Sequence, residues 1–137
     1  MTVAEFRRRA PEKSIQSAII GLLKAVGIPF SVTDATLVFD DRGKVAGRSV
    51  LSDGWPDVTG VLAGGRFLGV ETKSIDGRLR PSQIACHAAL RQAGALVIVP
   101  RSVEELAQGL PEAGLQNPLL NQLVAQTKGY KKHPYLF

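Results

Sequence analysis

The apolar positions of the chain follow a helical period near its start and a strand-like pattern soon afterwards. Over residues 11–27 they recur at steps of three and four, which predicts a helix that ends at Gly27. These positions are Ile15, Ile19, Leu22, Leu23 and Val26. Residues 30–40 are rich in β-branched and aromatic side chains and predict a strand that is closed by a turn over 40–43. The polar stretch 44–53 follows no clear period, so its structure stays open.

The middle of the chain predicts a β-hairpin. Two short apolar segments, 57–62 and 66–73, flank the sequence Ala63-Gly64-Gly65 and read as antiparallel strands. A helix follows from Arg80 to Gly94, which is a favourable stop signal. Its expected apolar positions are Ile84, Ala85, Ala88, Ala89 and Leu90.

The last part of the chain predicts one more strand and two short helices. The apolar run 95–99 is typical of a buried strand. Ser102 and Glu105 have capping-box spacing and predict a helix to about Leu110, and residues 115–126 could form another. The order of these elements predicts an α/β fold in which helices flank a mixed sheet. We expect residues 1–110 to form the main domain, with 111–137 as an extension of it or a dimer contact.

The charges of this chain of 137 residues are unevenly distributed. Residues 1–24 carry five basic and two acidic side chains, residues 125–137 carry three lysines and no acid, and the net charge is +5. Basic ends around a nearly neutral middle suit a polyanion such as DNA, although such ends can equally serve solubility.

Other features exclude several classes of protein. The apolar runs are too short to span a membrane, and no apolar segment follows Arg7-Arg8-Arg9 as a secretory signal would require. Cys86 is the single cysteine, so neither an internal disulfide nor a cysteine zinc site can form. We therefore expect a reducing, cytoplasmic setting.

Two carboxylates and a lysine of the hairpin carry the most distinctive chemistry. Glu71 and Lys73 alternate with Thr72, so their side chains share one face of the strand. Asp57 begins the neighbouring strand, and with Glu71 it could hold Mg²⁺, which prefers oxygen ligands. Lys73 could orient or help to deprotonate a water, or stabilise charge on a phosphate. This set predicts metal-dependent phosphodiester hydrolysis, whereas the simpler alternative is a surface ion pair.

The length of the hairpin loop decides whether the carboxylates meet. A two-residue turn at Gly64-Gly65 would place Asp57 opposite Thr72, and Glu71 would then face away. A three-residue loop pairs Leu62 with Arg66 and sets Asp57 opposite Glu71. We predict the three-residue loop or an equivalent bulge.

Three motifs around these residues resemble the VRR-NUC family of the PD-(D/E)XK nuclease superfamily. They are GWPDVTG over 54–60, GVETKS over 69–74 and GRLRPSQ over 77–83. The resemblance extends over about residues 11–107. It implies a restriction-endonuclease-like core, dependence on Mg²⁺ or Mn²⁺, and cleavage of DNA. Stand-alone members of this family are similar to small homodimeric enzymes that act on branched DNA such as four-way junctions.

The resemblance also implies roles for two helical residues. Glu12 matches a first-helix glutamate that joins the active site and would add to the metal ligands Asp57 and Glu71. Gln83 matches a glutamine beside the catalytic strand, where it would position water or phosphate. Both helices offer a second polar residue four positions later, Gln16 and His87. Gln16 could contribute a hydrogen bond to water or to a DNA phosphate, whereas we expect His87 to neighbour the site or lie on the surface rather than bind metal.

Candidate DNA contacts lie outside the carboxylate set. Arg78 and Arg80 follow the catalytic strand, and Lys131 and Lys132 lie among aromatic residues of the tail. Trp55 is expected to pack beneath the loop that carries Asp57. Two rival functions remain: a catalytically silent DNA-binding module, and a restriction or repair nuclease that acts on duplex DNA.

Overall fold

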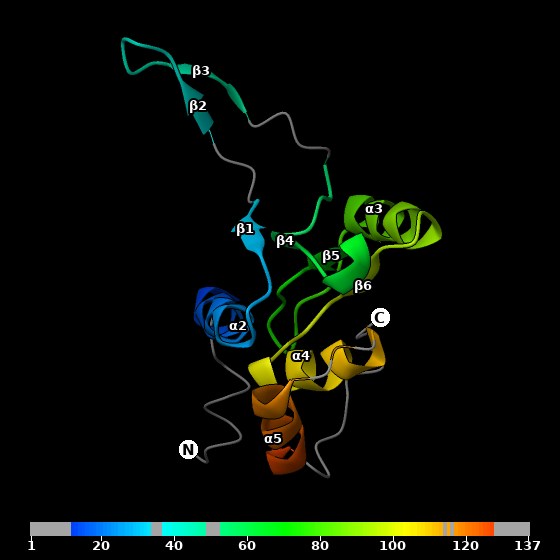
Figure 1. The fold of residues 1–137 in the computed structure, drawn as a ribbon. Helices are drawn as coiled ribbons and strands as arrows, with labels where there is room; N and C mark the ends of the chain where they lie inside the picture. Colours follow the sequence, from blue (N-terminus) through cyan, green and yellow to red (C-terminus); the bar gives the residue numbers. More distant parts are fainter. Residues whose placement is uncertain (1–11, 34–36, 49–52, 114, 116, 128–137) are drawn as a thin grey trace.

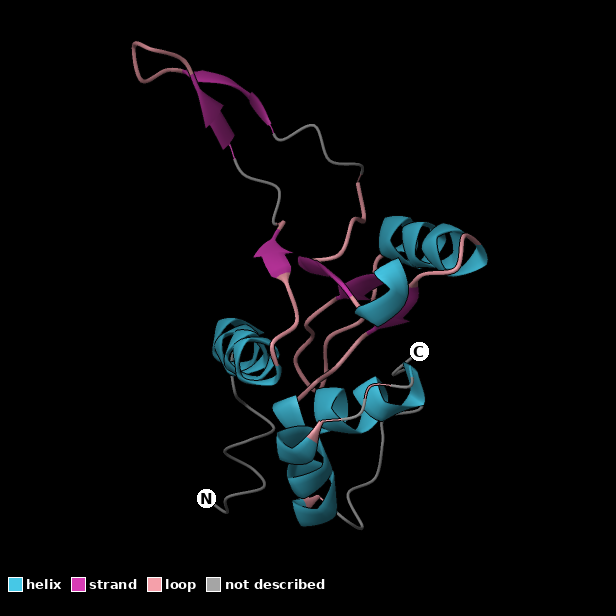
Figure 2. Ribbon diagram, viewed as in Figure 1, coloured by secondary structure: helices cyan, strands magenta, loops and turns pink. Residues whose placement is uncertain are grey.

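The computed structural model describes residues 12–33, 37–48, 53–113, 115 and 117–127. Its described helices are α2 (Glu12–Val26), α3 (Pro81–Gln92), α4 (Val103–Gly109) and α5 (Pro118–Gln126), with short 3₁₀ turns η1 (Ala63–Gly65) and η2 (Leu110–Ala113). Its described strands are β1 (Phe30–Val32), β2 (Leu37–Phe39), β3 (Val45–Arg48), β4 (Val58–Val61), β5 (Phe67–Val70) and β6 (Leu96–Ile98). Figure 1 shows their arrangement, and Figure 2 separates helices from strands by colour.

A four-stranded sheet in the order β1-β4-β5-β6 forms the centre of the fold. The pairs β1–β4 and β4–β5 are antiparallel, whereas β5 and β6 run parallel. A parallel pair needs a crossover between its strands, and α3 lies in the segment that makes this connection. The predicted fold class, a mixed sheet with flanking helices, is therefore confirmed.

Alternation along the strands separates an apolar face of the sheet from a polar one. Leu68 and Val70 of β5 and Ile98 of β6 are fully buried in the main core, together with the apolar stripe of α2. The intervening position Gly69 lies opposite Val97 on the other face, where Pro56 packs. Glu71 follows the same alternation and falls on this second face, the face against which α3 packs. The core thus holds the sheet rigid behind the polar residues of the hairpin.

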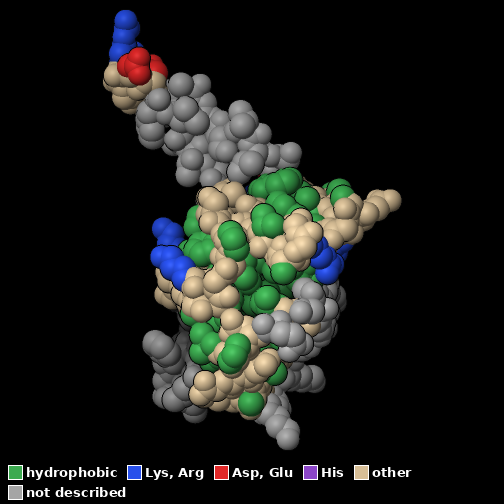
Figure 3. All heavy atoms as spheres, viewed as in Figure 1, with side chains coloured by type: hydrophobic (Ala, Val, Ile, Leu, Met, Phe, Trp, Pro, Cys, Tyr) green, Lys and Arg blue, Asp and Glu red, His purple; other side chains and the backbone are tan. Residues whose placement is uncertain are grey.

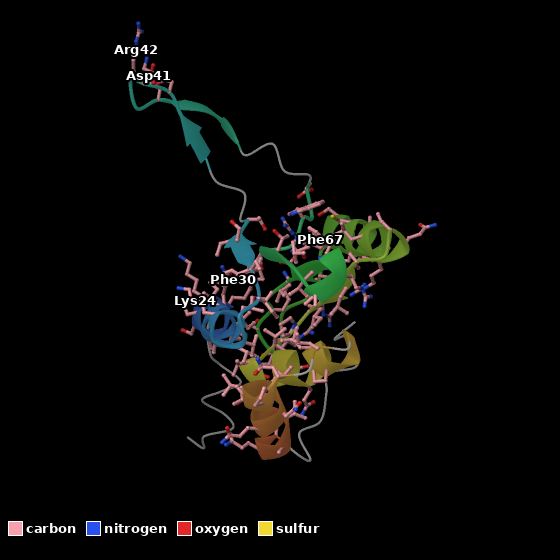
Figure 4. All side chains as sticks on the ribbon, in the orientation of Figure 1. Lys24, Phe30, Asp41, Arg42 and Phe67 are labelled. Atoms are coloured by element: carbon pink, nitrogen blue, oxygen red, sulfur yellow. The ribbon has the colours of Figure 1, made fainter. Side chains whose placement is uncertain are left out.

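The stretch between β1 and β4 departs from its prediction. The strand expected over 30–40 is divided into β1 and β2, and residues 34–36 between them lie outside the described part. The stretch left open, 44–53, contains β3, which pairs with β2 as a separate two-stranded sheet. Figure 1 shows this hairpin extending away from the body, and Figure 4 places Asp41 and Arg42 at its tip.

The buried face of α3 was also predicted wrongly. Among its expected apolar positions, Ala85, Ala88 and Ala89 are exposed and Ile84 is 55% exposed. The two residues that α3 buries are Gln83 and His87, one turn apart. A helix normally turns its apolar stripe to the protein, so this orientation means that polar groups on the sheet attract its polar side.

Candidate active site: a carboxylate pair beside the central hairpin

The hairpin has the register that brings the two carboxylates together. Val58 pairs with Val70 and Val61 with Phe67, and the Leu62 N–H donates to the Arg66 carbonyl at 2.8 Å. The loop between Leu62 and Arg66 is therefore the three-residue turn η1. Continuing the register by one position sets Asp57 opposite Glu71, and an oxygen of Asp57 accepts the Thr72 N–H at 3.2 Å. The predicted odd-length loop is confirmed.

Close backbone packing fixes the loop that carries Asp57. The Thr33 hydroxyl donates to the Pro56 carbonyl at 2.6 Å, and the Thr33 N–H donates to the Asp57 carbonyl at 2.7 Å. The Trp55 ring packs edge-on against Phe67 (labelled in Figure 4), with ring centres 5.7 Å apart. Trp55 thus supports this loop, as expected from the sequence.

Gly54 is the residue at which this loop contacts the backbone of α3, and its substitution tests that contact. Gly54 has φ +84°, and a Cβ there would overlap the backbone carbonyl of Ser82. We expect Gly54→Ala to lower the free energy of unfolding by at least about 2 kcal/mol and to displace Asp57. Gly27→Ala is the control, because Gly27 has φ +78° but no atom near its Cβ position, so about 1 kcal/mol is expected. Urea unfolding measures both, and equal losses would contradict the packing role of Gly54.

Glu71 lies just beyond the end of β5 and is the centre of the site. The expected strand over 66–73 is shorter than predicted, but the N–H groups of Glu71 and Lys73 still donate to the carbonyls of Ile98 and Pro100. The Glu71 side chain is 1% exposed, and its Oε1 accepts a hydrogen bond from Gln83 Nε2 at 2.7 Å. His87 Nε2 lies 3.6 Å from the same oxygen, and Glu71 Oε2 is buried with no hydrogen-bond partner.

The electrostatics of Glu71 favour a positive charge at this position. Burial raises the pKa of Glu71, and the negative charge of Glu12 raises it further. Interactions with Asp57 and the positive charge of Lys73 oppose this rise. A buried carboxylate under such conditions is stabilised either by a proton or by a bound cation.

The remaining predicted residues lie at different depths around this pair. Lys73 is half-buried and lowers the pKa of both Glu71 and His87, so its positive charge lies close to both. Glu12 is exposed at the start of α2 and acts on Glu71 through its charge. Gln16 is half-buried one turn later on α2. The structure therefore brings Asp57, Glu71, Lys73 and Gln83 together, with Glu12 at their edge.

Gln83 connects the carboxylate to the start of α3. Its Oε1 accepts the Arg80 N–H at 2.8 Å, while its Nε2 donates to Glu71. Because each end of the amide meets a different partner, the orientation of the group is fixed. Gln83 therefore holds Glu71 in place and also satisfies a backbone donor at the helix start.

The loop between Lys73 and α3 presents two exposed arginines. Arg78 and Arg80 are solvent-accessible and lie between Lys73 and α3. Arg101, which is buried, donates from Nη2 to the Gly77 carbonyl at 3.0 Å and so anchors this loop. Sequence reasoning missed Arg101, because its position two residues after the apolar run 95–99 gave no signal of this role. Lys131 and Lys132 lie outside the described residues.

A divalent cation fits the donor set of the pair. In the described part of the chain no three His, Cys, Asp or Glu side chains gather into a metal cluster. Asp57 and Glu71 would supply two ligands to a cation, with Glu12 further out. Mg²⁺ commonly binds through one or two carboxylates and keeps waters for the rest. The unpartnered, buried Oε2 of Glu71 is the atom that such a cation would satisfy.

Fold and site together define an α/β protein with an acidic pair, the buried Glu71 and the half-buried Asp57, and a lysine beside the central hairpin. Over 88% of its length the chain is similar to a solved structure described as "VRR_NUC domain", of which 97% is covered, with 20% identity and a TM-score of 0.49. No family model and no curated protein matches the sequence. None of the described helices is long and apolar enough to cross a membrane.

Proposed function

We propose that the protein is a metal-dependent DNA endonuclease that hydrolyses phosphodiester bonds. The observation that supports this most directly is the meeting of Asp57 and Glu71 across the hairpin, with Lys73 on the same side. When bound by the two carboxylates, Mg²⁺ or Mn²⁺ would polarise the phosphate and lower the pKa of an attacking water.

The residues of the chain divide the remaining tasks among them. Asp57 and Glu71 supply oxygen ligands, and Gln83 keeps Glu71 in its orientation through the 2.7 Å hydrogen bond. Lys73 stabilises the charge that develops on the phosphate or holds the attacking water. Glu12 contributes through water from the start of α2.

DNA is the substrate that the charge of the chain favours. The net charge is +5, and the exposed Arg78 and Arg80 lie in the loop between the catalytic strand and α3. Contacts from these arginines to phosphates would position the backbone without reading its sequence. Such contacts suit recognition of DNA shape, and we propose branched DNA such as a four-way junction as the substrate.

A homodimer would suit this substrate. Two sites related by a two-fold axis can cut two strands of a symmetric junction in a paired manner. We propose that the protein acts on such DNA in the cytoplasm.

A cleavage panel tests the proposal. We expect purified protein to cut a four-way junction faster than flapped or linear duplex DNA, with Mg²⁺ or Mn²⁺ and not with EDTA. Preferred cutting of linear duplex would favour the restriction or repair alternative instead. Binding of junctions without cleavage under every metal would overturn the nuclease proposal and support a silent DNA-binding module.

A further inference from the structure

The imidazole of His87 is a buried polar group whose role the proposed nuclease chemistry does not yet explain. His87 has no exposed surface, and neither of its ring nitrogens has a hydrogen-bond partner. Leaving such groups unsatisfied costs about 1–3 kcal/mol, so an apolar residue would serve packing better at this position. A buried histidine without partners therefore indicates a function that involves a neighbouring group.

The neighbouring group is the carboxylate of Glu71. His87 Nε2 lies 3.6 Å from Glu71 Oε1, the oxygen that already accepts the hydrogen bond from Gln83. A hydrogen bond needs a separation near 3.0 Å, so a carboxylate shift of about half an ångström would complete it. Gln83 and His87 lie one turn apart on α3 and are the two residues that this helix buries.

The geometry of the ring fits a donor. Nε2 is the ring nitrogen that lies 3.6 Å from Glu71 Oε1, and an imidazole always carries at least one N–H. A proton on Nε2 can therefore point to Glu71. Such a donor orients the carboxylate through Oε1, while the buried Oε2 has no hydrogen-bond partner.

We propose that His87 is a positioning residue that donates from Nε2 to Glu71 Oε1 when a divalent cation occupies the acidic pair. Gln83 and His87 then hold one oxygen of Glu71 from the same helix, and this leaves the unpartnered Oε2 directed to the cation. This inference rests on the proposed metal-dependent function. Outer partners of this kind contribute about 10–100-fold to metal affinity.

Metal binding by three variants tests the role of His87. Mn²⁺ affinity is measured on metal-free protein by electron paramagnetic resonance or calorimetry, together with the Mg²⁺ concentration that half-activates cleavage. We expect His87→Leu to weaken Mn²⁺ binding about tenfold or more and to raise the activating Mg²⁺ concentration to match. His87→Gln keeps an N–H donor and should stay within about threefold of the wild type. Ile84→Ala, at an exposed position of the same helix, should change neither value.

Two results separate this inference from the proposed function. Wild-type Mn²⁺ binding that disappears in Asp57→Asn, combined with unchanged affinity in His87→Leu, would overturn the role of His87 and leave the nuclease proposal standing. Absence of Mn²⁺ binding by the wild type would overturn both.

A measurement on the wild-type protein keeps the inference testable if His87→Leu fails to fold. Nitrogen-15 spectra of the side chain identify which ring nitrogen carries the proton. We expect the Nε2–H tautomer, with its resonance shifting when Mg²⁺ is added. An Nδ1–H tautomer in the presence of Mg²⁺ would overturn the proposal.

Discussion

Lys73→Ala is expected to reduce metal-dependent DNA cleavage by about a thousandfold while leaving DNA binding within about threefold of the wild type. The lysine follows Glu71 on the same side of the hairpin, and its charge is close enough to lower the pKa of Glu71. A group aimed at developing charge in a water-poor site contributes about 10²–10³ to the rate. Binding depends instead on many phosphate contacts, so one lysine contributes little to it.

The matched control for this prediction is Lys24→Ala. Lys24 is exposed in the last turn of α2, and Figure 4 shows it away from the hairpin residue Phe67. Both variants remove one positive charge, so a general electrostatic effect on DNA would slow them equally. Single-turnover cleavage at saturating protein measures the chemical step, and gel-shift or anisotropy titration measures binding. Cleavage by Lys73→Ala at the wild-type rate would refute the role of Lys73.

The apolar period of the sequence was sufficient to predict most of the fold. The α2 stripe from Ile15 to Val26 faces the core as predicted, because an apolar face that wide has to be buried. The register of the hairpin was also predictable, since strand alternation allows Asp57 and Glu71 to meet under one loop parity only. Both predictions rest on local rules that tertiary packing does not override here.

The errors fall where burial is decided by chemistry rather than by hydrophobicity. The sequence of α3 places alanines where an apolar stripe would lie, yet its buried side is Gln83 and His87. These residues turn inward because Glu71 offers a charged acceptor that is fully buried on the sheet. A hydrophobic pattern contains no information about such an acceptor on another element, so it left open whether His87 neighbours the site or lies on the surface. The structure places His87 beside Glu71 and fully buried.

The β2–β3 hairpin shows a second limit of sequence patterns. Residues 30–40 were predicted as one strand because their β-branched and aromatic side chains favour strand structure but give no sign of where the chain leaves its sheet. In the structure this stretch serves two sheets, with β1 in the body and β2 in the hairpin that extends from it. Figure 3 shows charged side chains of both signs at the tip of this hairpin, apart from the rest of the surface.

Glu71→Gln is expected to abolish cleavage and, in the absence of metal, to stabilise the protein by about 1–2 kcal/mol. Glu71 is a charge buried to 1% exposure, with one oxygen unpartnered and Asp57 opposite. The glutamine keeps an oxygen that can accept from Gln83, and its new N–H₂ can donate to Asp57. The substitution thus removes a buried charge while it preserves the existing hydrogen bond, although it removes an anionic ligand that a cation needs.

The stability that Glu71→Gln gains over the wild type should increase as the pH rises. Burial raises the pKa of Glu71 above its ordinary 4.5, so the folded chain holds this proton more tightly than the unfolded chain. Below about pH 4.5 the carboxyl is protonated in both states, and the variant should gain little. As the pH rises through the raised pKa, the wild type loses stability that the variant keeps, so the difference grows to a plateau.

Metal ions should reverse the order of stability. A cation that binds the folded wild type stabilises it by about 2.7 kcal/mol at a hundredfold excess over its Kd, whereas Glu71→Gln should not respond. Urea unfolding at pH 5 and pH 8, each with EDTA or Mg²⁺, measures all four states, with Asp41→Asn at the exposed hairpin tip as the control. A Glu71→Gln variant that is less stable than the wild type in EDTA at pH 8 would contradict the inference that the buried charge of Glu71 destabilises the metal-free protein. A variant that Mg²⁺ stabilises as much as it stabilises the wild type would show that the cation binds elsewhere. We therefore expect Glu71→Gln to be the more stable protein in EDTA and the wild type to be the more stable one in Mg²⁺. Both effects have one cause, because the carboxylate that binds the cation is the same group whose burial is unfavourable without a cation.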